Sequence, residues 1–150
     1  MKTHKLLMPL LLAAVFIYPA SAQSVAPRQL TEAATIRALL SEKYVGYSLP
    51  GWADTDVWEG FGADGSWTGT LLGRGPVSFS GRWKIDGERI CVLPDEQGVL
   101  IKWFSGWRCR VVWLDENTGH LSMEYLDPRD ASFGALTLNV RDFPRDAQVR

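Results

Sequence analysis

Apolar and polar residues alternate along most of the chain after Lys43, which is the pattern of half-buried β-strands. The clearest stretch is Val77–Ile85, in which Gly81 falls on the apolar face. A missing side chain at this position lets a neighbouring strand approach or the strand bend. Asp86-Gly87 is a hairpin signal, so we expect Arg89–Leu93 to return antiparallel to the first stretch.

The same alternation predicts about eight short antiparallel strands joined by turns. The other stretches with this pattern are Asp56–Phe61, Ser66–Leu72, Leu100–Phe104, Trp107–Leu114, a stretch with Leu121, Met123 and Tyr125, and a last one with Leu136, Leu138 and Val140. Strongly alternating strands favour closure, because a closed sheet has no exposed edges. We therefore expect a mainly β fold, a small calycin- or lipocalin-like barrel, with a β-sandwich as the alternative.

A helical spacing of apolar residues precedes the strands. We expect the helix to start at Thr31, and its pattern ends at Gly46. The residues on its expected core face are Leu30, Ala34, Ile36, Leu40 and Val45. The sequence therefore predicts one short N-terminal helix of about three turns.

The start of the chain, Met1–Ala22, has the three parts of a secretory signal peptide. Basic first residues are followed by the almost wholly apolar run Leu6–Tyr18 and by the small-residue cleavage site Ala20-Ser21-Ala22. An uncleaved membrane anchor is the alternative, but this run is shorter than the roughly 20 residues that a spanning helix needs. We expect a mature chain that begins at Gln23, is periplasmic or secreted, and has no stable membrane anchor.

The remaining length suits one domain, which we place at residues 23–141, followed by a mobile, charged tail at residues 142–150. The chain has 16 basic and 17 acidic residues, and removal of the signal peptide would take away only basic ones. It lacks the basic excess that nucleic-acid binding usually needs. We therefore expect a monomer that does not bind nucleic acid.

The chain has two cysteines, Cys91 and Cys109, and each lies in an expected strand. A single pair in an exported chain predicts one disulfide. Alternation groups Cys91 with Leu93, and Cys109 with Val111 and Trp113, so both sulfur atoms are expected to face the core. A redox role is disfavoured, because a redox pair would prefer a C-x-x-C spacing.

No group of residues in the sequence predicts catalysis. His120 is the one histidine after the signal peptide, and we expect it at the surface. Glu59 and Glu124 are acids of the kind that glycosidases use in pairs, but alternation puts both on the solvent face. The chain has no nucleophile elbow, phosphate-binding glycine loop or dinucleotide fingerprint. We therefore expect that the protein is not an enzyme.

Metal and cofactor binding are not indicated either. A site of the histidine and cysteine kind lacks ligands once the cysteines pair. Asp54 with Asp56, or Asp127 with Asp130, offer oxygen ligands to calcium, but neither pair matches a loop with the ligand number that this ion needs. We expect these carboxylates to be solvated.

The segment Lys102–Arg108 is the best candidate for a contact site. Trp103, Phe104 and Trp107 flank a Ser-Gly turn, and Arg108 follows. Adjacent strand residues point to opposite faces, so Trp103 and Phe104 cannot both point inward. Exposed aromatic residues beside arginine suit contact with a partner or ligand. The alternative is that this tip folds over and plugs the end of the barrel.

Four short motifs extend over most of the chain after the signal peptide. They are Lys43-Tyr44-Val45-Gly46, Asp64-Gly65-Ser66-Trp67, the stretch Gly81–Cys91, and Cys109-Arg110-Val111-Val112. In these motifs the chain resembles small exported proteobacterial proteins of the DUF995-like family, a domain of unknown function. The resemblance implies the same fold class and location and adds no catalytic residue.

Two functional classes follow from these expectations. The first is a non-catalytic binding or regulatory module that contacts another envelope protein through the aromatic segment, with Trp52 as a second residue at the barrel mouth. The second is a lipocalin-like carrier of a small apolar ligand. Tryptophans that point inward would crowd an eight-stranded interior, which favours the first class. The tryptophans expected inward are Trp58, Trp67, Trp83, Trp107 and Trp113.

Overall fold

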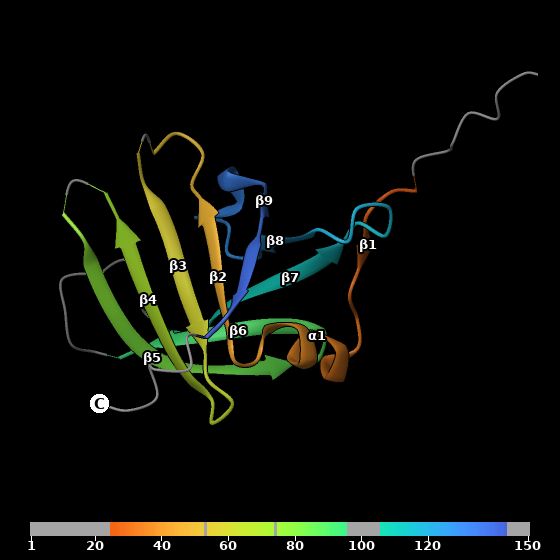
Figure 1. The fold of residues 1–150 in the computed structure, drawn as a ribbon, viewed down its shortest axis with the longest axis horizontal. Coiled ribbons are helices and arrows are strands. Elements are labelled where there is room, and N and C mark those ends of the chain that lie inside the picture. The colour runs from red at the N-terminus through yellow and green to blue at the C-terminus, as the bar shows by residue number, and fades with distance from the viewer. Residues whose placement is uncertain (1–24, 53, 74, 96–105, 144–150) are drawn as a thin grey trace, which may run out of the picture.

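The computed structural model describes residues 25–52, 54–73, 75–95 and 106–143, which form one antiparallel β-sheet curled into a barrel (Figure 1). The elements in chain order are β1 Arg28–Gln29, α1 Ala33–Leu40, β2 Lys43–Ser48, β3 Asp56–Phe61, β4 Ser66–Leu72, β5 Val77–Asp86, β6 Arg89–Pro94, β7 Arg108–Leu114, β8 Leu121–Tyr125, the 3-10 turn η2 Ala131–Phe133, β9 Ala135–Thr137 and β10 Asn139–Asp142. The mainly β fold is thus confirmed. The expected signal peptide and the strand at Leu100–Phe104 lie outside the described residues.

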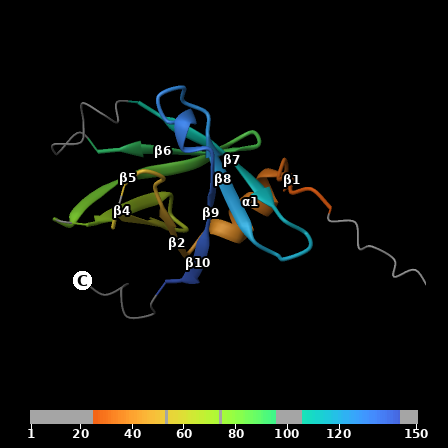
Figure 2. The same cartoon turned by 90° about the horizontal axis from the view of Figure 1, so that it is seen from above.

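The last strand nearly closes the barrel. Strands β2 to β9 pair with their neighbours in chain order, and β10 returns to pair with β2. Only Leu138 separates β9 from β10, and its N–H donates to the carbonyl oxygen of Leu121 at 2.9 Å. The chain therefore pairs with β8 up to this residue and with β2 after it. The view from above in Figure 2 shows this curled arrangement, which is a barrel and not the alternative sandwich.

Helix α1 is shorter than the sequence predicted, because the chain reverses right after Leu40. Glu42 has φ 59°, and its N–H donates to the carbonyl oxygen of Phe61 at 2.7 Å, which starts the pairing of β2 with β3. The prediction that the helix continues to Gly46 was wrong. From Lys43 onward the chain forms a strand that pairs with β10 on one side and with β3 on the other. Local spacing did not reveal these partners.

Helix α1 lies across one end of the barrel. It packs against β2 and β5, which are separated by two strands in the sheet. Ile36 and Leu40 are fully buried on its inner side, and the guanidinium of Arg37 lies 5.1 Å from the ring centre of Trp83. This end of the barrel is therefore covered, and the loops after β2, β4 and β8 lie at the other end. Among the described residues, no helix has the length and apolarity needed to cross a membrane.

Strand register decides which face of β7 lies inside the barrel. Buried Trp83 on β5 pairs with Val92 on β6, and Val92 pairs with Arg108 on β7. Ile90 pairs with Arg110 in the same way. Since paired residues share a face of the sheet, the two arginines point into the barrel.

The prediction for the orientation of β7 was therefore wrong. Cys109, Val111 and Trp113 lie on the outer face of the sheet, opposite to the arginines. Cys91 and Cys109 do form the predicted disulfide, with an S–S distance of 1.97 Å and a Cα–Cα distance of 4.0 Å across β6 and β7. The disulfide joins two neighbouring strands on the outside of the barrel and does not face the core.

The expected close approach at Gly81 is confirmed. Gly81 pairs with Pro94, and a Cβ atom added to it would lie 2.2 Å from the backbone carbonyl oxygen of Leu93. Only a residue without a side chain permits this contact between β5 and β6. Gly81 thus allows the strong curvature of the sheet at this point.

Candidate functional site

A buried ion pair occupies the barrel interior. Arg110 on β7 and Glu59 on β3 have exposed side-chain fractions of 1% and 4%. Both terminal nitrogens of Arg110 donate to the two carboxylate oxygens of Glu59, one of them at 2.9 Å. Nη1 of Arg110 also contacts the sulfur of Met123 at 3.2 Å. Burial opposes the charge on Arg110, but the attraction of Glu59 outweighs this effect and raises the pKa of Arg110.

The prediction that Glu59 lies on the solvent face was wrong. Glu59 alternates with Trp58, and Trp58 lies outside, where it covers Gly46 and stacks under Arg141 at 4.8 Å. Glu124 does lie on the outer face, as predicted, since its neighbours Met123 and Tyr125 point inward. No local signal distinguishes the two glutamates, because the partner of Glu59 is 51 residues away in the chain.

Two tyrosines extend the buried polar cluster. The hydroxyl groups of Tyr47 on β2 and Tyr125 on β8 form a hydrogen bond of 2.8 Å, and the guanidinium of Arg110 lies 5.1 Å from the ring centre of Tyr125. Burial raises the pKa of Tyr47 well above its ordinary value, and burial also raises that of Tyr125. Both hydroxyls therefore stay protonated at neutral pH.

Arg108 connects this cluster to the loop between β8 and β9. Its side chain is 5% exposed and forms an ion pair with Asp130. In the same loop, Phe133 packs edge-on against Tyr125, with ring centres 6.3 Å apart. Arg108 was predicted to be an exposed contact residue, but the structure places its guanidinium in the interior. Burial lowers the pKa of Arg108.

Aromatic rings fill the part of the barrel nearer to helix α1. Phe61 meets Trp83 edge-on with ring centres 5.4 Å apart, and Trp67 packs on Phe79 at 5.1 Å. Of the tryptophans expected inward, only Trp67 and Trp83 are. Together with the ion pair of Arg110 and Glu59, these rings occupy the barrel interior in the described part of the chain. Two pockets lie on the outer surface.

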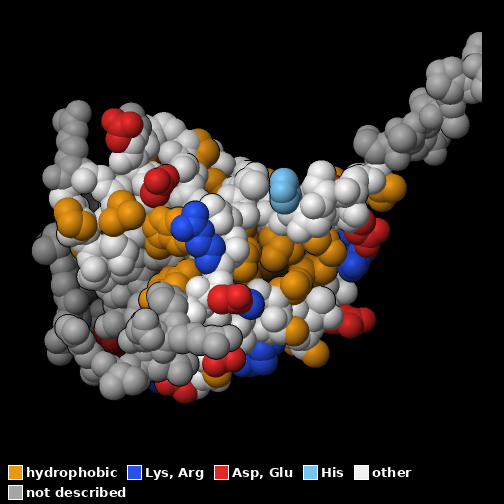
Figure 3. Space-filling view, viewed as in Figure 1, with side chains coloured by type: hydrophobic (Ala, Val, Ile, Leu, Met, Phe, Trp, Pro, Cys, Tyr) orange, Lys and Arg blue, Asp and Glu red, His pale blue; other side chains and the backbone are white. Residues whose placement is uncertain are grey.

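Two of the predicted contact residues are exposed. Trp107 is 42% exposed immediately before β7, and the ammonium group of Lys84 lies 4.7 Å from its ring centre. Trp52 is 52% exposed in the loop between β2 and β3. On the face drawn in Figure 3, hydrophobic side chains likewise show between charged ones. Trp103 and Phe104 lie outside the described residues.

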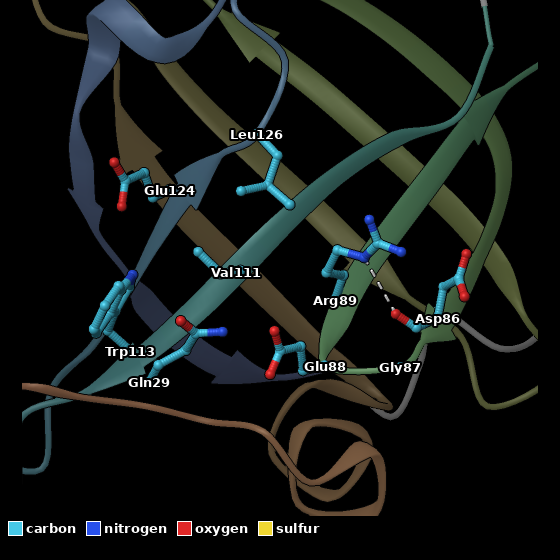
Figure 4. Close-up of a pocket in the computed structure, with 9 residues that line it drawn as sticks. All are labelled: Gln29, Asp86, Gly87, Glu88, Arg89, Val111, Trp113, Glu124 and Leu126. Carbon is cyan, nitrogen blue, oxygen red and sulfur yellow. Dashed lines mark hydrogen bonds between the residues drawn. The ribbon is translucent and has the colours of Figure 1, made fainter.

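An outer groove of about 560 Å³ lies over β7 (Figure 4). One wall is the turn Asp86–Arg89 between β5 and β6, and Gln29 of β1 borders the groove as well. Val111 and Trp113 of β7 lie between them and the opposite wall, which Glu124 and Leu126 form. The outer groove was not predicted, because its floor residues were expected to face the core.

A smaller pocket of about 390 Å³ lies beside Tyr44 and Phe143 on the outer face of β2 to β4. Neither pocket contains a histidine, and His120 is exposed in the turn before β8. Among the described residues, no three histidine, cysteine, aspartate or glutamate side chains come together as a metal site. Apolar and acidic residues line both pockets, and Arg89 is the one basic residue among their described lining residues.

Comparison with known proteins adds no relative: no protein-family model, curated protein sequence or solved structure matches the chain. The resemblance to the DUF995-like family stays a prediction.

Proposed function

We propose that the protein is an exported, non-catalytic binding module that contacts another protein of the cell envelope. The supporting observation is the contrast between the two sides of its sheet. The inner side is filled with aromatic rings and with the ion pair of Arg110 and Glu59. The outer side and the loops expose large apolar side chains, among them Trp52 and Trp107.

A filled interior disfavours the carrier function. A small apolar ligand in the barrel would have to displace Arg110 or Glu59 and leave the other charge buried without its partner. Such an uncompensated charge costs several kcal/mol, on the order of 3–5. Few apolar contacts of a small ligand would be left to offset this cost.

Exposed tryptophan is the residue type that suits a protein contact best. Tryptophan is enriched among the few residues that contribute most of the binding energy at interfaces. The ring of Trp107 is held against Lys84, so little side-chain entropy is lost when a partner covers it. We therefore assign Trp107 as the main contact and Trp52 as a second one.

Export is supported by the disulfide together with the apolar start of the chain. Disulfides form and persist in oxidising compartments such as the bacterial periplasm. Cell fractionation after expression of the full chain tests this part of the proposal. We expect a soluble exported product whose N-terminal residue is Gln23; a product that retains Met1 in the cytoplasm would contradict it.

Affinity capture after cross-linking in the producing cells tests the contact. We expect a specific cross-linked protein with the wild type, and its loss with Trp107→Ala or with Trp52→Ala. Val25→Ala is the control, because Val25 is also apolar and exposed but lies in the N-terminal segment. Equal capture by all variants would refute contact through these tryptophans. Trp103→Ala with Phe104→Ala tests the sequence-based candidates in the same way.

A titration with palmitate separates the binding module from the carrier. We expect no saturable change in tryptophan fluorescence, since Trp67 and Trp83 already pack inside the barrel. Saturable quenching that disappears in Trp83→Phe would overturn the proposed function in favour of the carrier.

A further inference from the structure

The outer groove exists because β7 changes its pairing partner halfway along. Strand β6 pairs with β7 as far as the pair Ile90 and Arg110, and β1 takes over at the pair Gln29 and Trp113. At this change the hairpin of β5 and β6 turns away from β7 (Figure 4). Val111, which is itself only 7% exposed, and Trp113 therefore form the floor of the outer groove.

The floor of the groove is apolar and held in place by backbone pairing. Trp113 pairs with Gln29 on one side and with Ser122 on the other. Leu126 is 46% exposed at the far wall, and its N–H donates to the carbonyl oxygen of Cys109 at 3.1 Å. A rigid apolar floor of this kind favours binding, because it loses little conformational freedom when covered.

Two acids without charge partners flank this floor. Within the part of the chain that the structure describes, neither Glu88 nor Glu124 forms an ion pair or a side-chain hydrogen bond. The third acid, Asp86, forms an ion pair with Lys84, with 3.4 Å between the carboxylate oxygen and the ammonium nitrogen. The basic residue in the groove, Arg89, directs its Nε to the backbone oxygen of Asp86 at 3.5 Å. The two glutamates thus leave the groove negative.

We propose that the outer groove binds an extended, basic segment of a partner protein, in which an apolar residue lies between lysines or arginines. The apolar side chain would cover Trp113 and Leu126, beside the buried Val111. The basic side chains on either side would reach Glu88 and Glu124, which lie on different sides of the floor in Figure 4. Charge complementarity selects a basic segment over an acidic one.

An extended peptide fits this arrangement better than a small cation does. In an extended chain, neighbouring side chains project to opposite sides, with residues of one side about 6.6–6.8 Å apart. When the apolar side chain faces the floor, the basic side chains beside it leave the backbone on the other side, and their long, flexible stems bend round to the glutamates of the two walls. A small polyamine offers charges but covers little of the exposed surface of Leu126. This proposal is independent of contact through Trp52 or Trp107.

Isothermal titration calorimetry on the protein produced from the full chain tests the proposal. The probe is acetyl-Lys-Leu-Lys-Leu-Lys-amide, and its counterpart of opposite charge is acetyl-Glu-Leu-Glu-Leu-Glu-amide. We expect binding of the basic peptide only, weakened by salt. The variant Glu88→Gln with Glu124→Gln is expected to raise its Kd about tenfold, as two partly exposed charge pairs are lost.

Two matched controls accompany this variant. Glu42→Gln with Asp54→Asn removes the same charge from exposed sites that do not line the outer groove, and asparagine tolerates the positive φ of Asp54. We expect the wild-type Kd within twofold. For the apolar floor, Leu126→Ala is expected to weaken binding severalfold, whereas Leu72→Ala, at a residue of similar exposure, is not.

The proposal is overturned by any of three results. These are no binding of the basic peptide to the wild type, an equal loss in the control variant, and spermidine binding as tight as that of the peptide. If Glu88→Gln with Glu124→Gln leaves partner capture intact while Trp107→Ala abolishes it, the proposed function stands without the groove.

Discussion

The substitution Glu59→Gln should cause a large loss of stability, although it only replaces one carboxylate oxygen by an amide group. Glu59 and Arg110 are almost fully buried and joined by two parallel hydrogen bonds. In the variant, Arg110 keeps its charge but no carboxylate remains to balance it. A single uncharged amide cannot accept both donors as the carboxylate does.

The expected magnitude follows from the burial of Arg110. Breaking a buried pair by removal of one partner costs about 3–5 kcal/mol, because the remaining charge is left in a medium of low polarity. A domain of this size is stable by about 5–15 kcal/mol in total. The loss should therefore lower the melting temperature by about 10–20 °C. The guanidinium of Arg110 has no second carboxylate within reach among the described residues.

Urea unfolding followed by tryptophan fluorescence measures this effect. The matched control is Glu124→Gln, which makes the same change on the outer face of β8 and should alter the free energy of unfolding by less than about 0.5 kcal/mol. A second test is the double variant Glu59→Leu with Arg110→Leu. Since it removes both charges, it should be more stable than Glu59→Gln.

The reasoning is refuted if Glu59→Gln and Glu124→Gln have the same free energy of unfolding. It is also refuted if the double variant loses as much stability as the two single leucine substitutions added together. Either result would mean that the charge of Arg110 is solvated in the folded protein.

Three other predictions concern the tyrosine, the tight glycine and the disulfide. Burial raises the pKa of Tyr47, so the unfolded chain releases this hydroxyl proton before the folded protein does, and stability is lost as pH rises past about 10. The urea midpoint should therefore fall less above this pH in Tyr47→Phe than in the wild type. An equal fall in both proteins would contradict the pKa shift. Gly81→Ala should destabilise by about 1–3 kcal/mol through its clash with backbone, while Gly75→Ala, with nothing near its added Cβ, should be neutral by thermal unfolding. Replacing Cys91 and Cys109 by alanine should cost about 3 kcal/mol. Dithiothreitol should lower the urea midpoint of the wild type by a similar amount, and a wild-type midpoint that does not respond to dithiothreitol would argue against this bond.

Much of the fold could be predicted from local patterns. The stretches Asp56–Phe61 and Ser66–Leu72 were expected as strands, and the structure gives β3 and β4 the same bounds. The hairpin at Asp86-Gly87 is also present between β5 and β6. These elements were predictable because alternation and turn glycines act over a few residues.

The contact site was harder to predict, and β7 shows why. Its alternating residues are Arg108 and Arg110 on one face and Cys109, Val111 and Trp113 on the other. Hydrophobicity alone assigns the second face to the core. The pattern carried no sign that both arginines would be buried, because their partners come from β3 and from the loop before β9.

The sequence by itself determined most of the β-strands of this protein, most of their turns and the pairing of its two cysteines, since each depends on local spacing or on a count of residues. Only the tertiary structure decided which side of β7 faces inward. Burial of an arginine is unfavourable alone and acceptable beside a carboxylate, so the outcome depended on Glu59 arriving from a distant strand. That arrangement placed the ion pair inside the barrel and turned Val111 and Trp113 outward, where they form the floor of the outer groove.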